Sequence, residues 1–272
     1  MADGCLNFDT NINSEGFEKG LKSLSDMVGD IKPKLKSLAM AVTAAFSVKK
    51  LVDFGRQSIE TASDLAEVQN VVDTAFGESK QKMEDFADTA VKTYGISKLT
   101  AKQTGSNFMA MAAGMGLAND SASDMAMALT GLSADMASFY NVGQDVASTA
   151  LKSIFTGETE TLKQFGIVMT DANLQAYALS KGITKSTADM SQAEKVQLRY
   201  NYVMSQTALA QGDFAKTSDS WANQTRILSE QWKEFGATIG TVLMNVLLPA
   251  VKAINSLLSQ LIALAQGAAR SL

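Results

Sequence analysis

The chain has 272 residues, of which 46% are hydrophobic and 19% are charged, a composition that argues against wholesale disorder. Its formal net charge of −4, without any block of basic residues, disfavours sequence-specific binding to nucleic acid, because the neutralisation of phosphates supplies much of that affinity. The chain has no histidine and a single cysteine, Cys5, which argues against histidine-dependent catalysis, zinc or iron–sulfur sites and an internal disulfide, so we expect neither an enzyme nor a cofactor.

The first 33 residues predict an N-terminal arm followed by one helix. Residues 5–12 alternate weakly between apolar and polar side chains, which is typical of a short extended segment. Ser14 is a suitable N-cap, and apolar residues then recur at helical spacing as far as Ile31, after which Pro33 ends or kinks the helix.

Residues 34–217 predict a compact body of helices. The only prolines, Pro33 and Pro249, lie near the two ends of the chain, so nearly everything between them can be helical. Gly77 and Gly95 are suitable residues to end helices. The apolar periodicity predicts helices over 35–61, 65–76, 83–94, 100–115, 119–140 and from a capping box at Ser191–Glu194 to Gly212.

Residues 154–183 predict a compact unit in which two helices meet at a corner. Gly157 can close one helix in the left-handed conformation, and Thr159 can cap a short helix that stops at Gly166. Thr170 can then cap a further helix. The residues that we expect to point inward are Leu162, Phe165, Ile167, Met169, Leu174 and Leu179.

Residues 218–272 predict a long C-terminal helical arm with two rows of mostly apolar residues repeating every seven positions, as in a coiled coil. The rows are Trp221, Leu228, Phe235 and Val242, and beside them Thr225, Trp232, Ile239 and Val246. We expect helix association through Trp221, Leu228, Trp232, Phe235, Ile239 and Val242. Gly236 and Gly240 would permit a close approach of another helix. Pro249 and Lys252 interrupt the apolar run before it reaches the roughly 20 residues of a membrane span, which favours a partner helix over a membrane-active segment.

Three weaker patterns are interpreted structurally. Ser47 and Lys50 have the spacing of a serine–lysine dyad but lack its companion motifs, so we interpret the match as chance. Gly114 and Gly116 follow a helix, not a strand, which favours a turn over a dinucleotide-binding loop. The methionines that crowd residues 109–136 fit a helical core better than an adaptable binding surface.

The corner has a recognisable order of residues, because Phe155 to Thr170 reads F-x-G-x-x-x-x-L-K-x-F-G-I-x-M-T. This run resembles the corner of tape-measure proteins from long-tailed bacteriophages. Further stretches are similar to the same family in the same order along the chain, namely Leu6–Thr10, Gly16–Leu21, Trp221–Thr225 and Leu248–Ala250. The motif falls here on Phe155, Gly157, Leu162, Lys163, Phe165, Gly166, Ile167, Met169 and Thr170.

The periodicity and the resemblance together predict an all-α protein with a multi-helix body, a long C-terminal helical arm and a short extended N-terminal segment. The resemblance implies a structural virion protein that scaffolds assembly of the tail tube, sets the tail length and assists genome delivery through the host envelope. The implied partners are the tail-tube protein, tail assembly chaperones and tail-tip or baseplate proteins. The resemblance also implies that the chain itself is located in the virion tail and, during assembly, in the host bacterial cytoplasm. We also expect a homo-oligomer that forms through the arm. Contact with the host membrane is a further candidate interaction.

A fully helical chain of this length spans at most about 400 Å at about 1.5 Å per residue, whereas family members that act as rulers are usually much longer. We therefore expect the chain to be an N-terminal portion or a truncated copy. One rival hypothesis is a secreted helical effector that acts on membranes or forms pores. The other is an enzyme that uses Ser47 and Lys50.

Overall fold

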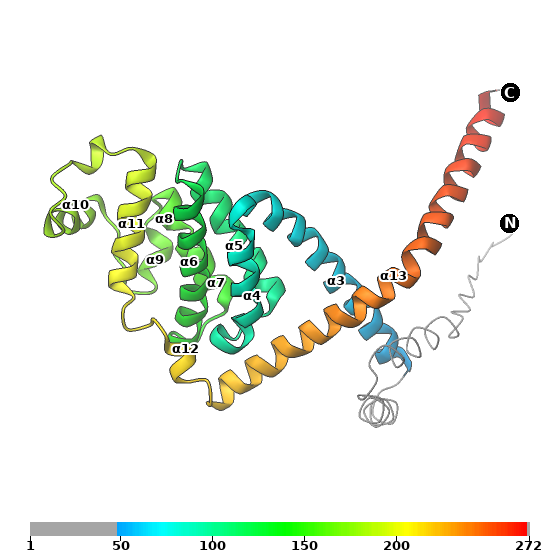
Figure 1. The fold of residues 1–272 in the computed structure, drawn as a ribbon, viewed down its shortest axis with the longest axis horizontal. Helices are drawn as coiled ribbons and strands as arrows, with labels where there is room; N and C mark the ends of the chain where they lie inside the picture. Colours follow the sequence, from blue (N-terminus) through cyan, green and yellow to red (C-terminus); the bar gives the residue numbers. More distant parts are fainter. Residues whose placement is uncertain (1–47, 271–272) are drawn as a thin grey trace, which may run out of the picture. The chain divides into compact units, whose positions relative to one another are not determined.

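The computed structural model describes residues 48–270, and every regular element in that range is a helix, which confirms the all-α class (Figure 1). The predicted N-terminal segment of residues 5–12, the helix from Ser14 to Ile31 and the chain up to residue 47 lie outside the described residues. The described helices, in chain order, are α3 (Val48–Phe76), the 3-10 turn η2 (Gly77–Ser79), α4 (Lys80–Tyr94), α5 (Lys98–Gly114), α6 (Asn119–Phe139), α7 (Gln144–Leu151), α8 (Ser153–Thr156), α9 (Glu160–Lys163), α10 (Asp171–Ser180), the 3-10 turn η3 (Thr187–Asp189), α11 (Gln192–Gln206), α12 (Asp213–Lys216) and α13 (Trp221–Arg270).

The chain forms two compact units. The first unit, from Asp64 to Phe235, contains α4 to α12 with the end of α3 and the start of α13. Among the described residues, the second unit joins residues 48–63 with residues 236–270. The boundaries predicted at residues 33 and 217 stay predictions.

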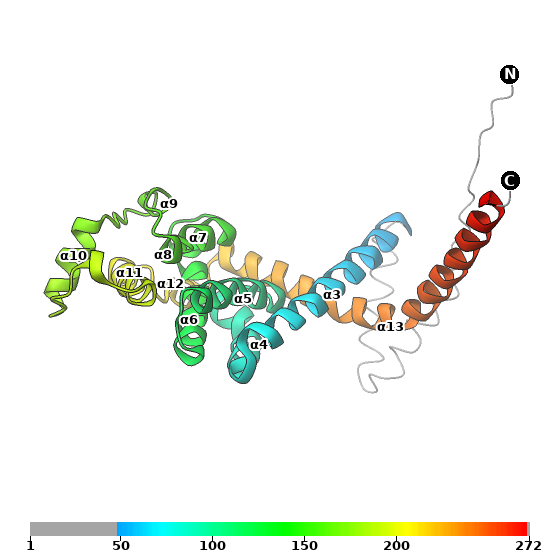
Figure 2. The ribbon, with the colours of Figure 1, turned by 90° about the horizontal axis from the view of Figure 1, so that it is seen from above.

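Helix α6 is the centre of the first unit. It packs against α4, α5, α7 and α12, and Figures 1 and 2 both show α5 beside it. The segment from Leu129 to Ala137 is buried at every position. A helix that is buried around most of its circumference needs small or apolar residues on all sides, and α6 supplies alanine, methionine, leucine and serine there.

Two predicted helix boundaries are wrong. The helices predicted over 35–61 and 65–76 are one helix in the described range, because no glycine or proline separates them, and the Thr61 hydroxyl donates to the carbonyl of Gln57 inside the helix (2.8 Å). Helix α5 begins at Lys98, two residues before the predicted start, because the hydroxyl of Ser97 caps it by accepting the Thr100 N–H (3.3 Å).

The end of α11 is a third correction, with a long-range cause. The helix ends at Gln206, well before Gly212, which instead has a left-handed φ of +73° and precedes α12. The carboxylate of Asp135 accepts the N–H groups of Gly212 (2.8 Å) and Phe214 (3.2 Å). Asp135 on α6 is buried, and desolvation raises the pKa of its carboxyl, although the two N–H groups act in the opposite direction. A distant side chain therefore organises the turn before α12.

In the second unit α3 and α13 cross closely. Ser58 and Ala62 of α3, one turn apart and both buried, face Gly236 and Gly240 of α13. Small residues spaced by four positions on both helices allow their backbones to approach, as the sequence predicts for the two glycines.

Helix α13 is 50 residues long and continues through Pro249, although a proline removes one backbone hydrogen bond from a helix. Figure 1 shows this helix changing direction between its orange and red parts. Among the described residues, none of the helices combines the length and the apolar character that a membrane span requires.

Candidate functional site

The two glycines of the corner, defined as residues 155–170, both adopt left-handed backbone conformations. Gly157 ends α8 with a φ of +76°, and its N–H donates to the carbonyl of Ser153 (2.8 Å). Gly166 follows α9 with a φ of +74°, and its N–H donates to the carbonyl of Lys163 (2.9 Å). Both glycines thus allow chain reversals that a residue with a Cβ atom would strain, as the sequence predicts.

The other positions of the corner motif differ in how far their side chains are exposed to solvent. Every position that the motif leaves open is exposed or half-exposed. Lys163 is exposed and pairs with Glu160 (2.6 Å), while the Thr170 hydroxyl accepts the N–H of Asn173 (3.3 Å) and so caps α10. The apolar motif residues are all buried, namely Phe155, Leu162, Phe165, Ile167 and Met169. The fixed apolar positions and the two glycines of the motif therefore specify a packed turn.

Aromatic contacts fix the corner to the body. Phe155 stacks on Phe108 of α5, with ring centroids 6.0 Å apart. Phe165 meets the ring of Tyr140 edge-on at 5.0 Å, and the Tyr140 hydroxyl donates to the carbonyl of Phe165 (3.1 Å). Such pairs contribute beyond their buried area, so they hold the corner in one orientation.

Two details of the predicted corner are wrong. Leu179 is 56% exposed, because α10 turns Leu174 and Ala178, one helical turn apart, toward the core. Thr159 makes no capping hydrogen bond to α9. The longer side chain of Glu158 accepts the backbone N–H groups of Glu160 and Thr161 instead, and the Thr161 hydroxyl with these N–H groups lowers the pKa of Glu158.

Arg199 of α11 completes the corner, a role for which the residues around it carry no local signal. Its Nη1 lies 3.4 Å from the carbonyl oxygens of both Ile154 and Phe155, at the end of α8. Burial lowers the pKa of the guanidinium. A Cβ atom on Gly157 would lie 2.6 Å from Nη2 of Arg199, so the absence of a side chain at Gly157 also leaves room for this contact.

The predicted stripe on α13 is largely exposed at its start. Trp221 is 88% exposed, Leu228 65% and Trp232 50%, and the ring of Trp232 lies 5.6 Å from that of Phe235. Phe235, Ile239 and Val242 are half-buried. The stripe residues that belong to the first unit, Trp221, Leu228, Trp232 and Phe235, therefore do not form a shared core.

A different face of α13 packs on the body. Oε2 of Glu230 accepts the N–H of Ser97 (3.0 Å), and Oε1 of Glu234 accepts the N–H of Lys98 (3.0 Å). Two carboxylates one helical turn apart thus bind the N-terminus of α5, where the helix dipole favours negative charge. Asn223 on the same helix is buried and donates to the carbonyl of Thr217 (3.1 Å).

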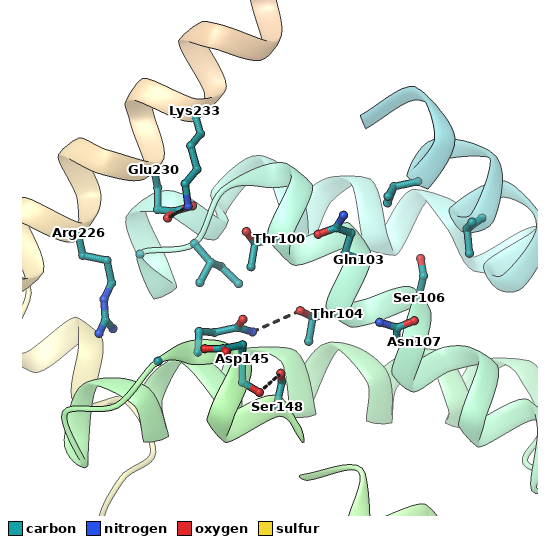
Figure 3. A pocket seen from close by; sticks show the side chains of 16 residues that line it. Thr100, Gln103, Thr104, Ser106, Asn107, Asp145, Ser148, Arg226, Glu230 and Lys233 are labelled. Atoms are coloured by element: carbon teal, nitrogen blue, oxygen red, sulfur yellow. Dashed lines mark hydrogen bonds and ion pairs between the residues drawn. The ribbon is translucent and has the colours of Figure 1, made fainter. Parts of the chain in front are cut away.

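An open groove of about 720 Å³ lies beside this contact, between α5, the start of α7 and α13 (Figure 3). The apolar periodicity of α5 does not indicate this groove. The available signal was a row of polar residues at helical spacing on that helix, Thr100, Gln103, Thr104 and Asn107. The other side chains that line it include Asp145 and Ser148 of α7 and Arg226, Glu230 and Lys233 of α13.

No group of three or more histidine, cysteine, aspartate or glutamate side chains within the described residues could hold a metal ion. Comparison with protein-family profiles, with curated protein sequences and with solved structures finds no match to this chain.

Proposed function

We propose that this chain is a tape-measure protein, or the N-terminal portion of one, from the tail of a long-tailed bacteriophage or prophage. In this role it acts as a scaffold around which the tail tube assembles, limits tube length and later assists genome delivery. Its partners would be the tail-tube protein, the assembly chaperones and the tip or baseplate proteins.

One observation carries this proposal. The corner motif, residues 155–170, divides into buried apolar residues, two left-handed glycines and a helix cap, with the open positions facing solvent. Apart from Lys163, every fixed position of this motif meets a packing or backbone requirement, which is expected of a structural protein, because a catalytic motif would place several titratable or nucleophilic groups at its fixed positions. Lys163, the one charged motif residue, is exposed and paired with Glu160.

The arm supports the same proposal. Helix α13 has 50 residues and, at about 1.5 Å per residue, a length of about 75 Å along its curved axis. It presents Trp221 and Leu228 to solvent at a spacing of seven residues. This is the pattern of a helix that associates with other long helices, as in a bundle along a tail axis.

The test is genetic and structural. The gene is deleted in frame from the phage or prophage that encodes it, and the particles are imaged by electron microscopy. We expect particles without tails, or tails of irregular length, and restoration of normal tails by the intact gene supplied in trans. Normal tails of uniform length in the deletion strain would overturn the proposal.

A further inference from the structure

We propose that the groove between α5, α7 and α13 binds an extended segment of a partner polypeptide through its main chain, with an acidic side chain of that segment at Arg226. This inference does not depend on the proposed function. The groove is large enough for a ligand, because its volume of about 720 Å³ lies within the range of roughly 300–1,000 Å³ that is usual for ligand sites.

Two amide side chains supply the chemistry that recognises a peptide backbone. Gln103 and Asn107 lie on the same face of α5, one helical turn apart, and both line the groove (Figure 3). Both are exposed and, among the described residues, neither side chain makes a hydrogen bond. A side-chain amide carries one acceptor oxygen and two donor hydrogens, so each can pair with the N–H and C=O groups of a peptide.

The spacing of the two amides suits an extended segment. Side chains one helical turn apart have Cβ atoms about 5–6 Å apart, and an extended chain repeats the direction of its peptide groups every two residues, or about 6.6 Å. Gln103 and Asn107 can therefore bind successive peptide groups that face the same way. On the α7 side of the groove the side chain of Gln144 is held in place, because its Nε2 donates to the hydroxyls of Ser133 (2.8 Å) and Thr104 (3.3 Å).

Charge favours an acidic side chain in the bound segment. Arg226 is half-buried at the groove and, within the described part of the chain, forms no ion pair or hydrogen bond. The neighbouring charges are compensated, since Lys233 pairs with Glu230 (2.6 Å) and Asp145 lies in the first turn of α7, where the helix dipole stabilises it. A guanidinium without a partner matches a carboxylate in geometry and charge.

The lining disfavours a sugar or a nucleotide. None of the described side chains that line the groove is aromatic, so they offer no surface on which a sugar ring or a base could stack. Arg226 is the only cation at the groove without a partner in the described chain, and a phosphate group is usually bound by several donors.

The probe is a library of short random peptides displayed on yeast and selected for binding to the full chain, followed by fluorescence anisotropy with the enriched peptides. We expect Asn107→Ala to weaken their binding about tenfold, because it removes a pair of hydrogen bonds. Asn70→Ala, which changes another exposed asparagine on α3, is the matched control and should leave binding unchanged. Because both side chains are exposed, the two variants should melt like the parent chain.

A coupling measurement tests Arg226. Replacing the acidic residue of a bound peptide by its amide should weaken binding to the parent chain but not to Arg226→Ala, as expected for two groups in contact. The proposal is overturned if no peptide is enriched, or if the enriched peptides bind Asn107→Ala as tightly as the parent. Binding that follows the net charge of the peptide and is insensitive to Asn107 would also overturn it.

Discussion

Gly240 of α13 lies directly against the backbone carbonyl of Ser58 on α3. A Cβ atom at this position would overlap the carbonyl carbon and oxygen of Ser58 and lie 2.9 Å from Cβ of Ala62. Backbone atoms cannot rotate away as a flexible side chain can, so the close crossing of the two helices depends on the missing side chain.

Gly240→Ala should therefore destabilise the crossing, although alanine is the better helix former. Overpacking in a close contact costs about 1–3 kcal/mol, more than the roughly 1 kcal/mol gained in helix propensity. Hydrogen exchange of the α3 and α13 amides measures the effect. Gly236→Ala is the control, because its Cβ atom would meet only the Ser58 hydroxyl at 3.5 Å, an ordinary contact. Equal protection in the two variants would show that the helices do not cross at Gly240.

Gly166→Ala should lower the stability of the corner. Its φ of +74° lies in the left-handed region, where a residue with a Cβ atom costs about 1–2 kcal/mol, and no neighbouring atom within 4 Å adds a clash. Thermal melting should show a lower midpoint. Gly114→Ala is the matched control, since Gly114 lies in α5 without a positive φ and also has no neighbour within 4 Å, so its midpoint should stay equal or rise. Gly105 is unsuitable as a control, because a Cβ atom there would lie 2.7 Å from Sδ of Met83.

Glu230→Gln together with Glu234→Gln should loosen the attachment of α13 to α5. The substitutions keep the size of the side chains but remove the charges that the N-terminus of α5 favours, a loss of about 0.3–1 kcal/mol for each charge. The expected result is faster hydrogen exchange at the amides of Ser97 and Lys98, which donate to these carboxylates at 3.0 Å. Glu67→Gln, an exposed glutamate on α3, should leave that exchange unchanged. Unchanged exchange in the double variant would contradict the capping role.

Glu194 should make stability depend on pH. Its carboxylate accepts hydrogen bonds from Lys185 and from the N–H of Ser191, and these lower its pKa from 4.5 to about 2. Because the folded-state pKa lies below the unfolded one, the stabilisation is complete above pH 4.5 and is lost as the pH falls toward about 2. Glu194→Gln should therefore melt below the parent chain near neutral pH, and the difference should shrink through that window. A difference that is independent of pH would count against the contacts of the Glu194 carboxylate with Lys185 and Ser191 as its source.

Self-association should depend on the exposed start of the stripe. Trp221→Ser with Leu228→Ser removes two large apolar side chains that are 88% and 65% exposed. Burying each in a partner would contribute about 1.5–3 kcal/mol, so the double variant should associate at least about a hundredfold more weakly. Sedimentation equilibrium at several concentrations measures this. Leu209→Ser, at a leucine that is 81% exposed outside the arm, should associate like the parent. A parent chain that stays monomeric would refute association through the stripe.

Most of the corner could be predicted from local sequence. Gly157, Gly166 and Thr170 act on backbone atoms a few residues away, so the residue type and its spacing determine the turn. Leu162 and Phe165 are spaced for one side of a short turn, and both are buried as expected. The prediction that Leu179 is buried was wrong, because its burial depends on which face of α10 turns toward the core. The spacing of apolar residues within α10 does not determine that orientation.

The helical class, most glycine turns and the capping box at Ser191 depend on contacts between near neighbours in the chain, so residue types and their spacing were enough to predict them. The face of α13 that docks on the body depends instead on long-range packing. Heptad spacing points to Trp221 and Leu228, yet the docked face carries Glu230, whose partner Ser97 is 133 residues away. The groove beside it was undetermined for the same reason: Asn107 and Arg226 line one site only after α5 and α13 have packed, and no periodicity within one helix specifies that packing.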